Sequence, residues 1–174
     1  MAVRPILRLG NPALRRVSDP VEEFNSPELD ALVADMFDTM EAANGAGLAA
    51  PQIGVALRVM IFSVDANPRY PDAESVPTTV LINPEFRITD EKLVPSWEGC
   101  LSVPGMRGQV PRYAAVNYTG FDPQGERIRR DAVGFHSIVF QHEYDHLDGV
   151  LYTDRIVDRD KFGFEDELLA AGVI

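Results

Sequence analysis

The chain has 174 residues, of which 45% are hydrophobic, and its formal net charge at pH 7 is −11. This size favours a single domain over residues 1–174, and the acidic charge argues against general nucleic-acid binding, including direct DNA binding. There is one cysteine and no long apolar run, so we expect no membrane span and a reducing compartment, the bacterial-type cytoplasm. An organellar protein with a trimmed transit peptide stays open as an alternative.

The first half of the chain predicts one helix and two strands. Ser26-Pro27-Glu28 is typical of a helix start, with an N-cap, a first-turn proline and a first-turn acid. Apolar residues at helical spacing follow until Asn44-Gly45, which ends the helix. Leu57–Val64 and Thr78–Ile82 predict strands, and Asn67–Pro77, which contains three prolines, predicts an exposed loop.

The second half predicts a hairpin followed by a helix. Tyr113–Phe121 and Glu126–Arg130 flank a turn that contains proline and glycine, as expected for paired strands. Phe135–Leu147 predicts a helix, and we expect residues 155–174 to form a C-terminal tail or short helix. Strands with one central helix, and no regular alternation of strands and helices, predict an α+β fold.

That helix carries the most informative stretch, His142-Glu143-Tyr144-Asp145-His146. Residues four apart lie one above the other on a helix face, so His142 and His146 can reach one metal ion. Glu143 stands beside the first ligand, where a carboxylate can take a proton from a metal-bound water. His136 points away from the two histidines, which indicates a packed or solvent-facing side chain. The alternative is an amphipathic helix with two unrelated histidines.

The third protein ligand of such a site has two candidates. Cys100 is the only cysteine, it stands in a segment rich in glycine and proline, and a thiolate is a good ligand beside imidazoles. A small buried hydrophobe is the other interpretation of Cys100. Glu165 would instead complete a site of a different metallopeptidase class. Glu165, Asp166 and Glu167 are also typical of the first turn of a solvated helix.

A glycine- and alanine-rich segment, Asn44–Gly54, follows the first predicted helix. Its glycines let the backbone approach a ligand closely. Gln52 offers an uncharged amide donor, which can stabilise a developing oxyanion. A plain loop that ends the helix is the alternative.

Together these segments resemble the peptide deformylase family. The matching stretches, in the family's order, are Gly45–Gln52, Glu98–Ser102 and Gln141–Gly149. The resemblance extends from Ile6–Pro12 to about Asp154. It implies an α+β fold in which antiparallel or mixed β-sheets pack around a central metal-binding helix. The implied reaction is metal-dependent hydrolysis that removes the N-terminal formyl group from N-formylmethionyl nascent polypeptides and releases formate.

The resemblance also implies roles for single residues. Cys100, His142 and His146 hold one divalent metal ion, Fe2+ as the usual working ion, with Zn2+, Ni2+ or Co2+ possible in purified protein. Glu143 is the base, and the Gln52 amide and the backbone N–H of Leu101 stabilise the oxyanion. The implied substrate contacts are Gly45, Ala46, Gly47, Glu98, Gly99, Arg107, Phe135, Ile138 and Val139.

Within that set, Gly45–Gly47 is expected to pair with the peptide backbone as a strand does. Phe135, Ile138 and Val139 are expected to line the pocket for the methionine side chain. For Arg107 two roles stay open, an anchor for a substrate carbonyl and a support for the loop that carries Cys100.

The implied partners are the N-formylmethionyl peptides of nascent chains and, through a weak contact, the ribosome. Some deformylases dock there through a basic C-terminal helix, but the segment Glu165–Gly172 is acidic. Two other classes of protein stay open, a metallopeptidase with an acidic third ligand and a non-catalytic module with a structural metal.

Overall fold

A computed structural model describes residues 2–64 and 75–174. In these ranges the strands form one antiparallel sheet in the order β1-β2-β3-β4-β5, with β6 added to β4. The strands are β1 (Gly47–Ala49), β2 (Val59–Val64), β3 (Val76–Cys100), β4 (Val103–Phe121), β5 (Arg127–Val133) and β6 (Phe162–Phe164). The helices are α1 (Pro27–Ala42), α2 (Gly134–Leu147) and α3 (Glu165–Ala170). Short 3-10 helices are η1 (Pro12–Arg15), η2 (Ala50–Ile53), η3 (Tyr152–Arg155) and η4 (Arg159–Lys161).

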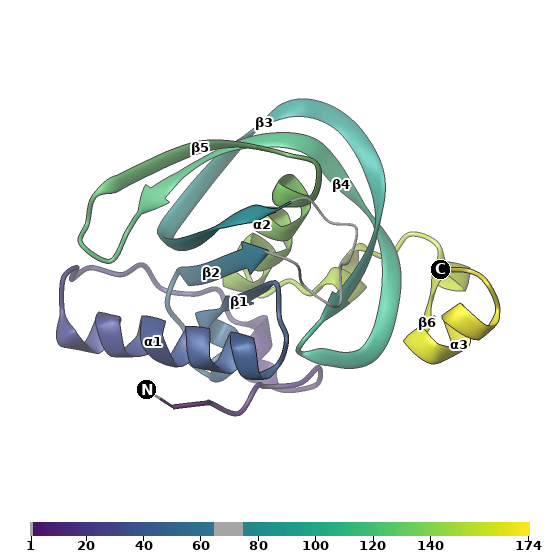
Figure 1. Ribbon diagram of the computed structural model, residues 1–174, viewed down its shortest axis with the longest axis horizontal. Helices are drawn as coiled ribbons and strands as arrows, with labels where there is room; N and C mark the ends of the chain where they lie inside the picture. The colour runs from purple at the N-terminus through teal and green to yellow at the C-terminus, as the bar shows by residue number, and fades with distance from the viewer. Residues whose placement is uncertain (1, 65–74) are drawn as a thin grey trace.

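The sheet curves around α2, while α1 lies outside it, alongside β1 and β2 (Figure 1). Aromatic rings fill the space between α2 and the sheet, where Phe140 stacks on Tyr118 with ring centroids 4.6 Å apart. A second group of buried apolar side chains joins α1 to β1 and β2. The α+β fold with a central helix is therefore confirmed.

Both predicted helices form. The Ser26 hydroxyl accepts a hydrogen bond from the Leu29 N–H at 3.3 Å, which caps α1 as expected. α2 spans almost the predicted range and begins one residue earlier, at Gly134. No helix in the described ranges is long and apolar enough to cross a membrane.

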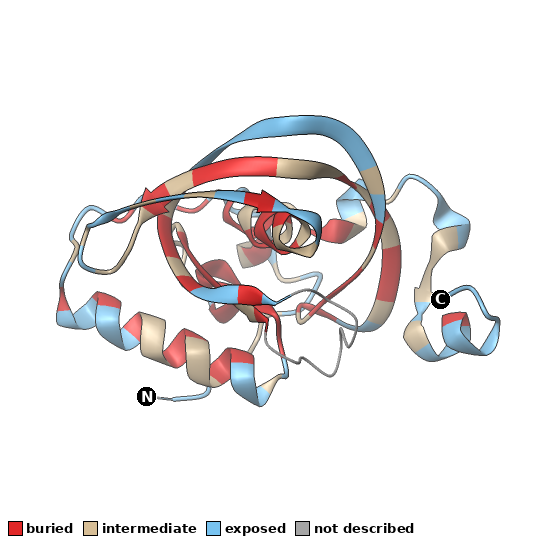
Figure 2. Cartoon of the chain, turned by 45° about the horizontal axis from the view of Figure 1, so that its top comes forward, coloured by how far each residue is buried: buried red, intermediate tan, exposed pale blue. Residues whose placement is uncertain are grey.

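The strand predictions were right in place and wrong in length. The predicted strand Thr78–Ile82 is only part of the start of β3, which continues to Cys100, and Val76 and Pro77 of the predicted loop already belong to it. Residues 67–74 of that loop lie outside the described residues. The long middle stretch of β3 is exposed on the outside of the molecule (Figure 2). Its charged residues hide the apolar alternation by which strands are recognised, and pairing with β4 stabilises it instead.

The hairpin prediction is confirmed for β4 and β5, which pair from Ala115–Val133 to Phe121–Arg127. β4 begins ten residues before the predicted Tyr113, at Val103. The turn after Cys100 therefore joins two long paired strands, and the register shifts between Glu98 and Cys100. This turn places the thiol of Cys100 over α2.

Candidate active site

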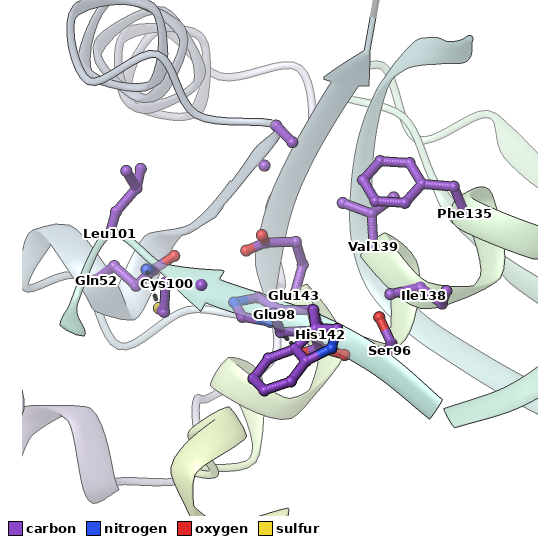
Figure 3. A pocket seen from close by; sticks show the side chains of 14 residues that line it. Gln52, Ser96, Glu98, Cys100, Leu101, Phe135, Ile138, Val139, His142 and Glu143 are labelled. Atoms are coloured by element: carbon purple, nitrogen blue, oxygen red, sulfur yellow. Dashed lines mark hydrogen bonds and ion pairs between the residues drawn. The ribbon is translucent and has the colours of Figure 1, made fainter. Parts of the chain in front are cut away.

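The end of β3 and the face of α2 bring three possible metal ligands together, of which Figure 3 shows Cys100 and His142. The ligand atoms of Cys100, His142 and His146 lie within 4.8 Å of one another. The Cys100 Sγ is 3.3 Å from the His146 Nε2. Cys100 and His146 are buried, and no other group of this kind occurs in the described part of the chain.

The geometry of this cluster fits a divalent metal ion. With metal–sulfur distances of about 2.3 Å and metal–nitrogen distances of about 2.0–2.1 Å, a tetrahedral site separates sulfur from nitrogen by about 3.6 Å. The 3.3 Å between Cys100 and His146 is close to that value. One thiolate and two imidazoles suit zinc, iron, cobalt or nickel, and three protein ligands leave a position open.

A buried chain of charges supports His142 from behind. Its Nδ1 donates to the Glu98 Oε2 at 2.8 Å, because the ionised carboxylate can only accept. Glu98 receives two hydrogen bonds from Arg112, at 2.7 and 2.9 Å, and Arg112 donates to Asp145 at 2.6 Å. Arg155 completes the chain through two bonds to Asp145. With Nδ1 occupied, the Nε2 of His142 is left for the metal.

These contacts set the charge of Glu98. Burial alone would raise the pKa of its carboxyl, but the hydrogen bonds from Arg112 and His142 outweigh burial and lower the pKa to about 2. Glu98 is therefore ionised at neutral pH. The sequence indicated Glu98 as a substrate contact, whereas its role in orienting His142 and the part of Arg112 became visible only in the fold.

Glu143 lies beside the metal ligands in a different environment. Its side chain is buried, and its Oε2 has no hydrogen-bond partner among the described residues. Burial raises the pKa of this carboxyl to about 7. The side chain rests against the backbone of Gly47, where an added Cβ would come within 2.8 Å of the Glu143 Cδ.

Gln52 points its amide donor at the cluster. Its Oε1 accepts from the Ala49 N–H at 2.8 Å, which fixes the amide orientation. Its Nε2 lies 3.6 Å from the Cys100 Sγ and 3.2 Å from the Ser102 Oγ. Cys100 also accepts from the Ser102 N–H at 3.4 Å. The amide nitrogen of Gln52 therefore faces the space next to the possible metal position.

A cavity opens beside these groups between α2, β1 and the end of β3. Most of the predicted site residues line it, and Ser96 and Trp97 join them. The predicted residues on its walls are Ala46, Gly47, Gln52, Glu98, Gly99, Cys100, Leu101, Phe135, Ile138, Val139, His142 and Glu143. Phe135, Ile138 and Val139 form its apolar wall on α2 (Figure 3).

Two predicted contact residues lie next to the cavity instead of on its wall. Gly45 lies behind Leu101, where an added Cβ would be 2.9 Å from the Leu101 Cδ1. Arg107 packs against Gly99 and donates to the Glu165 Oε1 at 2.9 Å. The rival metal ligand Glu165 is therefore engaged by Arg107 and stands outside the metal cluster.

Comparison with known proteins agrees with this geometry. A sequence profile described as polypeptide deformylase matches residues 3–162. The chain belongs to the polypeptide deformylase family.

Curated relatives that match nearly the whole chain are also named peptide deformylases. A peptide deformylase 2 of Ralstonia nicotianae is 58% identical, over 95% of this chain and 94% of the relative. A peptide deformylase 1 of Nitrosomonas europaea is 55% identical, over 99% of this chain and 98% of the relative. This deformylase is therefore a hydrolase of protein biosynthesis that removes the N-terminal formyl group from nascent peptides, in a family that depends on a metal.

Solved structures give the same result for the fold. The chain is similar to a class I type b peptide deformylase of Acinetobacter baumannii with Met-Ala-Ser bound, with a TM-score of 0.86, 40% identity, and coverage of 89% of this chain and 99% of that one. A peptide deformylase of Thermotoga maritima matches with a TM-score of 0.81 and 32% identity, over 91% of this chain and 100% of that one.

Proposed function

We propose that Cys100, His142 and His146 hold the metal ion of this deformylase, with Fe2+ as the working ion in the cell. Zn2+, Ni2+ or Co2+ would occupy the same ligands in purified protein. The soft thiolate beside two imidazoles supports all four ions. Bound there, the metal supplies Lewis acidity, which polarises a carbonyl and lowers the pKa of water towards about 7.

Glu143 moves the proton in this proposal. A buried carboxyl whose pKa is about 7 is close to balance between its two protonation states at neutral pH. It therefore takes a proton from the attacking water and returns it to the leaving amine. The absence of a hydrogen-bond donor at its Oε2, among the residues described, keeps that oxygen available for the proton.

Gln52 and Leu101 stabilise the negative charge that develops on the formyl oxygen. The Nε2 of Gln52 already faces the cluster, and Leu101 follows the ligand Cys100 directly on the cavity wall. Donors that are fixed before the reaction need no reorganisation when charge appears, and one such donor is worth about 2.7–4 kcal/mol.

The substrate lies between β1 and α2. β1 is at the end of the strand order in the described sheet, and Gly45–Gly47 leads into it, so this segment offers backbone that can pair with an extended peptide. The methionine side chain fits against Phe135, Ile138 and Val139. Gly99 contributes backbone to the wall, and Arg107, held by Glu165, supports Gly99 from behind.

We infer a cytoplasmic enzyme that acts on chains as they leave the ribosome. The predicted weak contact with the ribosome does not use a basic C-terminal helix, since the first turn of α3 carries Glu165, Asp166 and Glu167. A different surface of the protein would therefore make the contact with the ribosome.

The observation that carries the proposal is Glu143 beside the Cys-His-His cluster in one apolar-walled cavity. The test compares formyl-Met-Ala, acetyl-Met-Ala and formyl-Asp-Ala as substrates, by release of free amine. We expect turnover of formyl-Met-Ala alone to be efficient, because a hydrogen-only acyl carbon fits between Gln52, Leu101 and the metal ligands. Comparable kcat/KM for the acetyl peptide would refute the proposed site geometry. Cleavage of the Met–Ala bond would indicate a peptidase instead.

A further inference from the structure

A groove beside the first turns of α1 lies apart from the metal cavity. Its volume is about 820 Å³, and among the described residues it shares no lining residue with the cavity that contains Cys100 and His142. α1 lies on the outside of the molecule and forms one wall (Figure 1), and residues 19–23 and 55–57 complete the groove. The apolar lining consists of Pro20, Val21, Leu29, Leu32, Val55 and Leu57.

Negative charge surrounds this apolar surface. The rim of the groove consists of four exposed acidic residues, Asp19, Glu22, Glu23 and Glu28. None of these four carboxylates makes an ion pair within the described part of the chain. Arg4 also lines the groove, but its guanidinium is bound to Asp35 at 2.8 Å. The rim therefore keeps its negative charge in the isolated protein.

The sequence around the groove extends this acidic character. Residues 17–57 contain eight acids and no lysine, arginine or histidine, so this segment has a formal charge of −8, against −11 for the whole chain. The eight acids are Asp19, Glu22, Glu23, Glu28, Asp30, Asp35, Asp38 and Glu41. Like charges at this density repel one another and create a local field that attracts cations. A positively charged occupant relieves that repulsion.

We propose that this groove binds a basic amphipathic segment of another protein. The apolar side chains of the segment enter the groove, and its lysine or arginine side chains pair with the acidic rim. Nucleic acids and anionic lipids carry the same sign of charge as the rim, which repels them, and it also repels the same face of a second copy of the chain. The proposal concerns a surface outside the metal cavity and does not depend on the deformylase reaction.

The binding test uses a labelled helical peptide in which leucine occupies one face and lysine the other. We expect this peptide to bind the native protein, by fluorescence polarisation, and to bind more weakly as salt is raised. The same peptide with glutamate in place of lysine should not bind. A peptide of equal composition whose leucines are scattered around the helix should bind about tenfold more weakly, because it cannot place them in the groove together. No binding of the first peptide, or equal binding of either control peptide, overturns the proposal.

Removal of the rim charges tests where the peptide binds. The triple substitution Glu22→Gln, Glu23→Gln and Glu28→Gln keeps the size of the side chains and should weaken binding about tenfold, as expected for the loss of several exposed ion pairs. The matched control removes three exposed acids that do not line the groove, by Glu91→Gln, Glu126→Gln and Glu167→Gln. This control should bind as the native protein does. Equal weakening in both variants would mean that the peptide responds to net charge alone, and would overturn the groove as its site.

A substitution inside the groove provides a second test. Ala31 is exposed on the α1 wall, so Ala31→Arg places a long cationic side chain in the groove and should abolish binding of the leucine–lysine peptide. Ala170→Arg makes the same change at an exposed position of α3, off the groove, and should leave binding unchanged. Native affinity in Ala31→Arg overturns the proposal even if the triple variant fails to fold.

Three further measurements distinguish other occupants. Excess Met-Ala, the product of the proposed reaction, should not displace the peptide, and displacement would place it in the metal cavity instead. Binding of single-stranded RNA or of phosphatidylserine vesicles that is lost in Ala31→Arg would assign the groove to a phosphate-bearing partner. Self-association that is lost in Ala31→Arg, by analytical ultracentrifugation, would assign the groove to a second copy. Each of these three results overturns the proposal, and we expect none of them.

Discussion

Two buried glutamates of the same site, Glu98 and Glu143, have pKa values shifted in opposite directions because their surroundings differ. Glu98 receives hydrogen bonds from Arg112 and His142, and its pKa falls to about 2. Glu143 is equally buried but has an oxygen without a hydrogen-bond partner in the described structure, and its pKa rises to about 7. In the proposed mechanism, Glu98 orients a metal ligand and must keep its charge, whereas Glu143 exchanges a proton and must be able to lose its charge. The difference in partners gives the two residues these opposite properties.

The largest effect is expected when a proposed metal ligand is removed. Cys100→Ala removes one of three protein ligands, so the purified protein should lose most of its bound metal and nearly all of its activity. Metal analysis of the freshly isolated variant is the measurement. Full metal stoichiometry would contradict the assignment of Cys100 as a ligand and favour the alternative third ligand, Glu165.

Glu143→Gln should lower turnover while metal binding is retained. Glutamine is nearly isosteric, so the ligands stay in place while the proton acceptor is lost. We expect normal metal content and a loss in kcat of about 10²- to 10⁴-fold. Near-normal activity of the metal-loaded variant would show that another group moves the proton.

Glu98→Gln tests the charge behind His142. The neutral amide keeps the shape of the side chain but weakens the bonds to Arg112 and His142, and such outer partners are worth about 10- to 100-fold in metal affinity. Competition with a chelator measures the change. Glu91→Gln, an exposed substitution on the same strand, is the matched control and should bind metal as the native enzyme does.

The smallest effect is expected at Gly47, where the backbone makes room for Glu143. The Cβ of Gly47→Ala would displace the Glu143 side chain. Misplacement of a reacting group lowers the rate, and here we expect a loss of about tenfold in kcat with unchanged metal content.

The control for Gly47→Ala is Gly163→Ala, since a Cβ there meets only ordinary contacts. Equal kcat in both variants would mean that Gly47 does not position the carboxylate.

The sequence predicts well what is local. The two helices, the β4–β5 turn and the histidine spacing each depend on residues a few positions apart. Most of β3 and the Glu98–Arg112–Asp145 chain were not predicted, because Glu98 and Arg112 meet only through the pairing of two long strands. β6 was not predicted either, since its three residues are stabilised by β4 and give no periodic signal of their own.

The turn after Cys100 has a consequence for folding. Glu98 and Arg112 are only 14 residues apart, so their contact closes a short loop. Cys100 and His146 are 46 residues apart, and closing that longer loop costs about 1 kcal/mol more in chain entropy. The β3–β4 hairpin can therefore form, starting at its turn, before α2 packs against it. A metal ion held by Cys100, His142 and His146 would link the end of this hairpin to α2, which packs later. Removal of the metal should therefore weaken the packing of α2 before it affects the hairpin.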